Sequence, residues 1–386
     1  MFKPCFLAPF LICSTFLAGC GGGGATPEAA TPLSAAAQVG QLIFKDPSLS
    51  ASGTMSCQTC HDPSIGHASP FAQAVVDVGP LANQKGLRTP PAINYLKFNG
   101  PFKFENGTPK GGFFGDGRAD SLAAQAKGPF LNVAEMANLN EAAVIVKLSN
   151  ATYKDQFKKV FGAEILNDPV AAFDRMAFAL ERYQIEDADF APFNSKFDAV
   201  NQGQEAFTAE ELRGLMWFNR SDKGNCAACH PSTKPDNAPA ALFTDFSYDS
   251  LGVPRNADIA ANSDAGFYDK GLCGPVRLDL SAQTPLCGKF KVPSLRNVAQ
   301  RKRFFHNGKF TTLEEVVDFY ITRDTRATHW YTNALNVFTL YNDLPPNERQ
   351  NVNTSEGPYN RSGQTAALDD SEKRDLIAFL KTLSDR

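Results

Sequence analysis

The sequence predicts a mainly α-helical protein, made of two similar domains with long loops and few strands. Three observations support this fold class. Residues 113–129, FFGDGRADSLAAQAKGP, and residues 304–320, FFHNGKFTTLEEVVDFY, share the pattern F-F-x-D/N-G-R/K-x-x-S/T-L at an offset of 304 − 113 = 191 residues. Apolar residues recur at helical spacing in several segments, whereas alternating apolar and polar runs are few. The length of 386 residues suffices for two domains of ordinary size.

Three segments outside this repeat carry helix signals. Residues 208–218, TAEELRGLMWF, open on a capping box formed by Thr208 and Glu211. Residues 168–184, DPVAAFDRMAFALERYQ, place apolar side chains at helical spacing after an Asp-Pro start. Residues 368–383, LDDSEKRDLIAFLKTL, are amphipathic and have acidic residues in the first turn. Each segment is therefore predicted to be a helix.

The composition is that of a globular protein. Hydrophobic residues make up 43% of the chain and charged residues 20%, which fits neither a disordered nor a membrane-embedded protein. The formal net charge is −3 and no basic run is present. The charge pattern therefore predicts no nucleic-acid partner.

The first residues predict export from the cytoplasm. Residues 1–20, MFKPCFLAPFLICSTFLAGC, combine one early Lys, an apolar core and small residues at the end, and are too short for a spanning helix. Their last four residues, LAGC, resemble the lipobox of bacterial lipoproteins, in which Cys20 becomes the lipidated N-terminus. Residues 21–32, GGGGATPEAATP, are typical of a flexible tether. We expect a periplasmic, outer-membrane or surface lipoprotein with no other membrane contact; the alternative is an ordinary cleaved signal.

Two of the cysteine motifs predict covalently bound haem. CQTCH at residues 57–61 and CAACH at residues 226–230 match the attachment motif of c-type haem. The two thiols form thioethers with the haem vinyl groups, and the adjacent His takes the fifth iron position. A zinc site fits less well, because each motif carries its own His and no further Cys cluster completes a tetrahedral set. The prediction is two haem c groups, held by Cys57, Cys60, His61, Cys226, Cys229 and His230.

The remaining cysteines of the mature chain are Cys273 and Cys287. In an oxidising compartment they predict a disulfide that closes the loop between them, and two free thiols are the alternative. The haem motifs are followed by the same order of features, RTPPAIN (88–94) or KVPSLRN (291–297) and then the repeated pattern. We therefore predict two haem domains, residues 33–195 and 196–386.

The two copies of the repeat differ where an iron ligand would stand. All five methionines precede Cys226, so the second domain has no Met ligand to offer, and His306, His329 and several tyrosines are its candidates. In the second copy Tyr320 shares a helical face with Leu313, Val316 and Val317, a face that must be buried. A hydrogen-bonded core tyrosine is the alternative.

In the first copy the position matching Tyr320 is Pro129, which offers no ligand (320 − 191 = 129). The contrast predicts a first haem with an open face, where peroxide can bind, and a second haem closed by a phenolate. Two strong axial ligands make an electron-transfer site, whereas an open face makes a reactive one.

These motifs resemble the bacterial di-haem cytochrome c peroxidase and MauG superfamily over nearly the whole mature chain. The resemblance implies that the N-terminal haem is the peroxide site, with distal roles for Gln125, Pro129 and Glu135. It also implies that the far ligand of the second haem is Met in the peroxidases and Tyr in the MauG-like branch. Tyr320 therefore indicates the latter branch, and the surface-attached, MbnH-like members in particular.

The implied activity is a peroxidase that uses hydrogen peroxide. A carboxylate such as Glu135 over an open haem can take the first proton of peroxide and return it to the leaving oxygen, with Gln125 as a hydrogen-bonding partner. Electrons pass through the second haem, either from a small redox protein or from a residue of a protein substrate. The alternative function is a non-catalytic electron-transfer cytochrome, which needs His67 as a ligand of the first iron.

The chain departs from the resemblance at several positions. Gly115 stands where the family usually has a Trp that is thought to link the haems, so electron transfer between them must use another route, such as Phe113 or Phe114. We expect His67, just past the first haem motif, to line the pocket or lie on the surface, and His306 to pack near the second haem. The resemblance also implies a calcium ion between the domains, near Thr89, Lys291 and Pro293.

Overall fold

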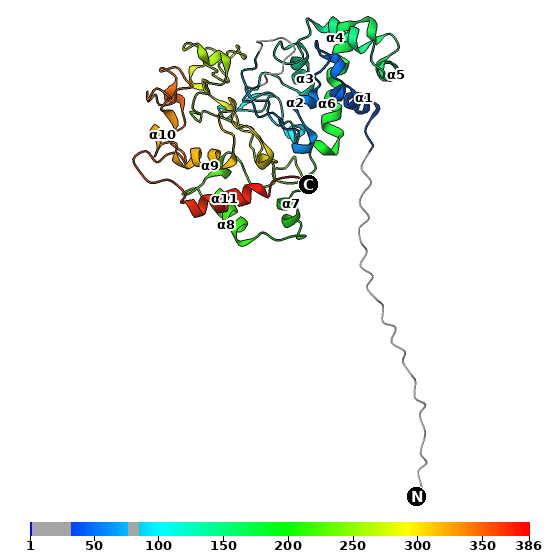
Figure 1. Cartoon of the computed structure of the whole chain (residues 1–386). Coiled ribbons are helices and arrows are strands. Elements are labelled where there is room, and N and C mark those ends of the chain that lie inside the picture. The colour runs from blue at the N-terminus through cyan, green and yellow to red at the C-terminus, as the bar shows by residue number, and fades with distance from the viewer. Residues whose placement is uncertain (2–31, 76–84) are drawn as a thin grey trace. The chain divides into compact units, whose positions relative to one another are not determined.

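The computed structural model describes Met1, residues 32–75 and residues 85–386. The predicted export signal, the lipid anchor at Cys20 and the tether before Pro32 lie outside the described residues. Residues Leu33–Arg386 form one compact unit (Figure 1). Among the described residues, no helix has both the length and the apolar character needed to cross a membrane.

The described residues are mainly helical, as predicted. The longer helices of the first half are α1 (Ala35–Lys45), α2 (Cys57–Cys60), α3 (Leu122–Leu131), α4 (Glu141–Leu148), α5 (Lys154–Phe161) and α6 (Pro169–Glu186). Those of the second half are α7 (Lys196–Asn201), α8 (Ala209–Asn219), α9 (Leu313–Thr322), α10 (Ala327–Tyr331) and α11 (Asp370–Lys381). The strands β1 (Lys103–Glu105) and β2 (Thr108–Lys110) pair antiparallel, as do β3 (Tyr248–Asp249) and β4 (Phe290–Lys291).

The helix signals of the sequence are confirmed at their caps. Helix α8 begins with the capping box of Thr208 and Glu211. Helix α6 begins at Pro169, and the side chain of Asp168 accepts hydrogen bonds from the next backbone N–H groups. Helices α9 and α11 also have capping boxes. These side chains satisfy N–H groups that no helical carbonyl can reach.

The repeat in the sequence is also a repeat in structure. Each copy closes an antiparallel bridge, Phe113 to Ala119 and Phe304 to Phe310. The second Phe of each copy has a left-handed backbone, with φ of 62° at Phe114 and 63° at Phe305. Helices α3 and α9 then begin 313 − 122 = 191 residues apart. The two copies therefore place their helices in the same way relative to the preceding loop.

Two hydrophobic clusters form the core. One draws on residues between Val39 and Phe190, and the other on residues between Phe197 and Leu383. In the first, α1 packs against α6; in the second, α8 packs against α11 (Figure 1). The division into domains 33–195 and 196–386 stays a prediction.

A glycine lies at each of these two helix contacts. A Cβ at Gly40 would overlap the backbone oxygen of Ala179 in α6, and a Cβ at Gly214 would overlap that of Asp375 in α11. Overlap with rigid backbone cannot be relieved by a side-chain movement. The sequence therefore needs glycine at both positions, although glycine disfavours a helix by about 1 kcal/mol relative to alanine.

We expect Gly214→Ala to lower the free energy of unfolding by about 1–3 kcal/mol, because overpacking at α11 outweighs the gain in helix propensity. Urea unfolding followed by circular dichroism measures the change. Gly100→Ala is the matched control, since a Cβ there meets no atom within 4 Å. Equal stabilities of the two variants would contradict the close helix contact.

The predicted disulfide is present. Cys273 and Cys287 are bonded, with 5.0 Å between their Cα atoms, and both are buried. The bond closes the loop between them in the second half of the chain. The four cysteines of the two haem motifs form no disulfide.

Candidate functional site

A single cavity of about 820 Å³ connects the two haem motifs. Its walls include Cys60 and His61 from the first motif and Cys226, Cys229 and His230 from the second. Side chains from both halves of the chain complete it. The structure therefore brings the two predicted sites into one continuous space.

The residues around this cavity fit two haem c groups. Burial lowers the pKa of both His61 and His230 to about 4, so each imidazole is neutral, the form that binds a metal ion. The Nδ1 atom of His230 lies 2.8 Å from the carbonyl oxygen of Phe243, which leaves Nε2 for iron. The four free thiols beside these histidines supply the thioether bonds.

Helix α3 and the turn after it bring the predicted distal residues together. Gln125, Pro129 and Glu135 all line the cavity. Burial raises the pKa of Glu135, although a hydrogen bond from the Asn132 side chain (2.6 Å) and the charge of Arg118 oppose the shift. A carboxyl group with a raised pKa beside a cavity is suited to exchanging a proton with a bound substrate.

Tyr320 occupies the matching position of α9. Together with Leu313, Val316 and Val317 it lines the cavity, as the helical face predicted. Burial raises the pKa of Tyr320, and so does the proximity of Cys229 and Cys226. Its side chain therefore lies close to the second haem motif.

The Tyr320 hydroxyl differs in its partners from those of two other tyrosines in the second half of the chain. Within the described residues it makes no hydrogen bond, whereas the Tyr359 hydroxyl donates to Asp249 (3.1 Å) and the Tyr331 hydroxyl donates to the carbonyl of Gly252 (2.5 Å). A buried phenol normally finds a partner. An iron ion would supply one for Tyr320 and would hold it as phenolate.

The two histidines that were alternatives to Tyr320 have other surroundings. His306 lines the cavity, but its ring stacks on Phe290 at 3.7 Å, and its Nε2 atom lies 3.3 Å from a carboxylate oxygen of Asp343. His329 is exposed on α10. Neither arrangement points to an iron ligand.

The expectation for His67 is wrong. His67 is 0% exposed and does not line the cavity. Its ring stacks on Phe190 at a centroid distance of 3.9 Å, with Phe44 at 6.0 Å. The chain turns inward because Gly66 and His67 both have positive φ. Because His67 packs in this aromatic environment and not on the cavity wall, the structure gives no support to it as a ligand of the first iron, which was the one route to an electron relay visible in the sequence.

Gly115 leaves space between the two sites. It lines the cavity, and a Cβ at this position would meet no atom within 4 Å. Phe114, next in the chain, also lines the cavity. No neighbouring side chain among the described residues therefore fills the place that the family's usual Trp would take at position 115.

The residues predicted to hold calcium fit the ion poorly. The Thr89 hydroxyl already donates to the carbonyl of Ala74. The Lys291 side chain is buried, which lowers its pKa to about 7, and its amine donates to the carbonyl of Gly112 (2.6 Å), so that oxygen also has a partner. Calcium prefers six to eight oxygen ligands that include carboxylates. We derive no step through calcium, and its presence stays a prediction.

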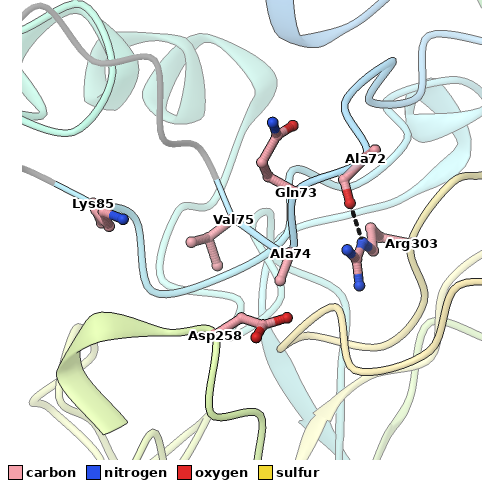
Figure 2. A pocket seen from close by; sticks show the side chains of 7 residues that line it. All are labelled: Ala72, Gln73, Ala74, Val75, Lys85, Asp258 and Arg303. Carbon is pink, nitrogen blue, oxygen red and sulfur yellow. Dashed lines mark hydrogen bonds between the residues drawn. The ribbon is translucent and has the colours of Figure 1, made fainter. Parts of the chain in front are cut away.

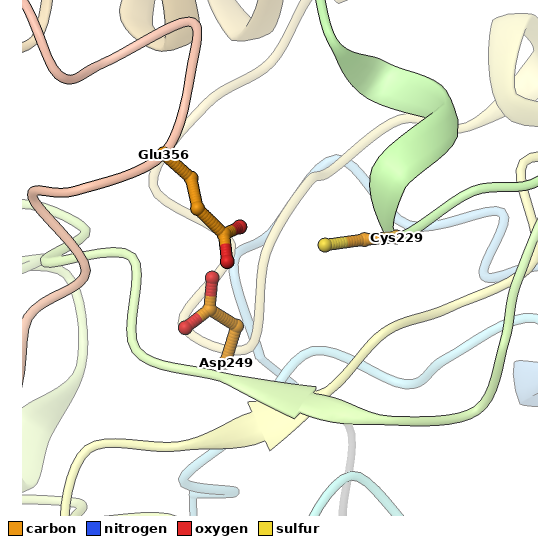
Figure 3. Close-up of side chains that lie close together, drawn as sticks. All are labelled: Cys229, Asp249 and Glu356. Atoms are coloured by element: carbon orange, nitrogen blue, oxygen red, sulfur yellow. The ribbon is translucent and has the colours of Figure 1, made fainter. Parts of the chain in front are cut away.

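Two other groups of residues belong to hollows of the structure. Figure 3 shows Asp249, Glu356 and Cys229, whose ligand atoms lie within 4.8 Å of one another. Because Cys229 belongs to a haem motif, this group is part of the second haem site. A smaller pocket of about 270 Å³ shares Lys85 and Arg303 with the large cavity. Figure 2 shows its lining residues, among which Arg303 donates to the carbonyl of Ala72. It contains no Cys or His, so it does not fit a haem.

Sequence reasoning missed a buried ion network between the haem motifs. Asp116 is 0% exposed and accepts hydrogen bonds from Arg88 (2.7 Å) and Arg118 (2.8 Å). Arg88 also forms a two-point contact with Asp269 (2.6 and 2.8 Å). The signal was present in the repeat, since Asp116 and Arg118 are its D/N and R/K positions.

Comparisons with known proteins agree with the geometry. Residues 34–206 match the family described as di-haem cytochrome c peroxidase. The chain is 38% identical to the methylamine utilization protein MauG of Paracoccus denitrificans over 94% of this chain and 92% of that protein. It is 32% identical to the cytochrome c551 peroxidase of Nitrosomonas europaea, over 75% and 74% of the two chains.

A solved structure has the same architecture. The di-haem peroxidase BthA of Burkholderia thailandensis superimposes with a TM-score of 0.83 at 37% identity, covering 92% of this chain and 87% of that one. The fold, the paired haem motifs and these similarities lead to one conclusion. The chain belongs to the di-haem cytochrome c peroxidase and MauG family and binds two haem c groups.

Proposed function

We propose that this protein reduces hydrogen peroxide at the haem of the first motif and receives the electrons through the haem of the second. The observation that carries the proposal is the contrast between Pro129 and Tyr320 at equivalent positions of α3 and α9, both of which line one cavity. Proline leaves room for a substrate, whereas a phenol with no other partner supports a closed iron site.

The residues around the first haem have different roles in the proton transfers. When bound, this haem supplies the iron that binds peroxide and passes on the two electrons that reduce it. Glu135 takes a proton from one peroxide oxygen and returns it to the other as the O–O bond breaks and water leaves. Asn132 holds the carboxylate through its 2.6 Å hydrogen bond, and Gln125 offers a donor to the substrate. Two electrons and two further protons complete the reduction to two water molecules.

The electron donor is either a small redox protein or a residue of a protein substrate. The names of the relatives include both a cytochrome c551 peroxidase and MauG, a methylamine utilization protein. Tyr320 supports the MauG-like mode, in which a partner protein is oxidised. Gly115 weighs against rapid charge sharing between the haems. Export to the periplasm suits either partner, and the lipid anchor at Cys20 stays a prediction.

The pH dependence of the peroxide reaction tests the role of Glu135. Its pKa is raised by burial, so the active carboxylate is lost at a higher pH than an ordinary Glu, whose pKa is about 4.3. We expect the second-order rate with peroxide to fall as the pH falls through this raised value. Stopped-flow absorption of the haem bands measures it. An acid limb at or below the ordinary pKa would contradict the assignment.

The absorption spectrum of the ferric protein separates this function from a plain electron relay. One high-spin and one low-spin haem support the peroxidase, whereas two low-spin haems support the relay. Peroxide is then added with and without a reduced small cytochrome. Rapid cytochrome oxidation indicates peroxide removal, and a long-lived oxidised state with slow turnover indicates modification of a protein partner. Failure to react with peroxide would overturn the proposal.

A further inference from the structure

Arg118 lies on the same side of the first haem site as Pro129. Its guanidinium is 3.5 Å from the centroid of the Phe114 ring. Phe114 in turn packs against α3, because a Cβ at Gly128 would lie 3.1 Å from its ring. Gly128 immediately precedes Pro129. Helix, aromatic ring and guanidinium therefore form one stack beside the open face.

The guanidinium is held in place from behind. Its Nη1 atom lies 2.8 and 2.9 Å from the two carboxylate oxygens of Asp116. Asp116 is fully buried and is itself fixed by Arg88. A fixed carboxylate and an aromatic face together leave the Arg118 side chain little freedom, so it is preorganised.

The donors of Arg118 are only partly used. Within the part of the chain that the structure describes, its side-chain hydrogen bonds involve Nη1 alone, so Nε and Nη2 keep their N–H groups. The side chain is 29% exposed and lines the cavity together with Gln125 and Glu135. Unused donors therefore belong to a side chain of the peroxide site.

The other copy of the repeat lacks this feature. The matching residue is Lys309 (118 + 191 = 309), which is exposed, as Arg118 is, but does not line the cavity. Both residues make the same local turn, since each backbone N–H donates to the side chain two positions earlier. The cation that lines the cavity thus belongs to the copy with Pro129, whereas the matching cation of the copy with Tyr320 does not line it.

We propose that Arg118 is a catalytic residue of the peroxide reaction, donating hydrogen bonds to the oxygen that leaves when the O–O bond breaks. This inference rests on the proposed function. The electron pair of the bond goes to the departing oxygen, which takes the proton held by Glu135 and leaves as water, while the haems supply the two electrons. A fixed donor aimed at a developing negative charge stabilises the transition state. The positive charge of Arg118 also favours the ionised form of Glu135.

Three variants of the protein with both haems attached test the proposal. Arg118→Gln is expected to lower the rate with peroxide about 10²-fold, and to move the acid limb of the pH profile upward by about 1 unit, because Glu135 loses a nearby cation. Arg118→Lys keeps the charge without the planar fork. We expect Arg118→Lys to keep the acid limb of the pH profile at its native position but to react with peroxide more slowly than the native protein.

The matched control is Arg277→Gln. Arg277 also belongs to this cluster, since it lies 3.9 Å over the Phe102 ring and donates to the backbone oxygen of Asp116, but it does not line the cavity. Its removal is expected to leave the peroxide rate within about twofold of the native rate, in line with a structural role alone. Circular dichroism of each variant shows whether it keeps the native fold, because the covalently attached haems absorb light even in an unfolded chain.

Cyanide binding to the ferric protein gives a readout that needs no electron transfer. Arg118→Gln is expected to weaken cyanide at least tenfold, because the bound anion loses its donor. The proposal is overturned if Arg118→Gln and Arg277→Gln lose the same share of the peroxide rate and of cyanide affinity. It is also overturned if Arg118→Gln reacts normally with peroxide and cyanide but has a shifted haem potential, a result that would make Arg118 a partner of a haem propionate. If the native protein does not react with peroxide, the proposed function is wrong. The cyanide affinities of the native protein and the variants then still test whether Arg118 contacts a ligand of the first haem.

Discussion

A Glu135→Gln variant is expected to react with hydrogen peroxide about 10²–10⁴-fold more slowly than the native protein. The amide can still accept the hydrogen bond that Asn132 donates to the carboxylate over 2.6 Å, so the local geometry is kept. It cannot take a proton from peroxide or return one. Stopped-flow absorption at several peroxide concentrations measures the second-order rate.

The control for this variant is Glu181→Gln. Glu181 accepts a hydrogen bond from the backbone N–H of Ala123 at the start of α3, so it contacts the same helix but not the cavity. We expect a nearly native rate from it. If Glu135→Gln kept both the native rate and the native acid limb of the pH profile, the base would have to be another group.

Replacing Tyr320 by Met is expected to raise the reduction potential of the second haem on the order of 0.1 V, within the roughly 0.8 V range that axial ligands set. An anionic phenolate stabilises ferric iron, whereas a neutral thioether favours ferrous iron. Asp249 and Glu356 beside Cys229 add negative charge near this haem and act in the same direction as the phenolate. Spectroelectrochemical titration of both haems measures the shift.

Tyr359→Phe is the matched control for this experiment. Its ring lies 6.5 Å from that of Tyr320 and lines the same cavity, but its hydroxyl is bonded to Asp249. We expect a much smaller shift and an unchanged low-spin spectrum. A large shift in Tyr359→Phe with none in Tyr320→Met would move the axial ligand to Tyr359.

The structure confirms much that short stretches of sequence predicted. The caps of α6, α8 and α11 are set by residues two or three positions apart, and such local pairs can be recognised without knowing the fold. The haem motifs are also contiguous. The contrast between Pro129 and Tyr320 needed only the alignment of one part of the chain with another, and the structure places both residues on the wall of one cavity.

His67 shows why other features could not be predicted in this way. Its position just past the haem motif suggested the pocket or the surface, but burial depends on the aromatic side chains that surround it. Phe190 follows His67 by more than a hundred residues and provides the stacking surface. A residue that is close to an iron ligand in the sequence can therefore still point away from the haem cavity in the folded protein.

The sequence by itself determined the two haem attachments, the duplication and the difference between its copies, because each depends on residue identity at fixed spacing. Only the tertiary structure decided that the Tyr320 hydroxyl faces the cavity without a hydrogen-bond partner among the described residues, and that Arg118 is fixed by Asp116 beside the cavity. The physical reason is that hydrogen-bond partners are shared across the fold. Arg88, which anchors Asp116, also binds Asp269 across 181 residues of chain, and no local pattern encodes such a contact.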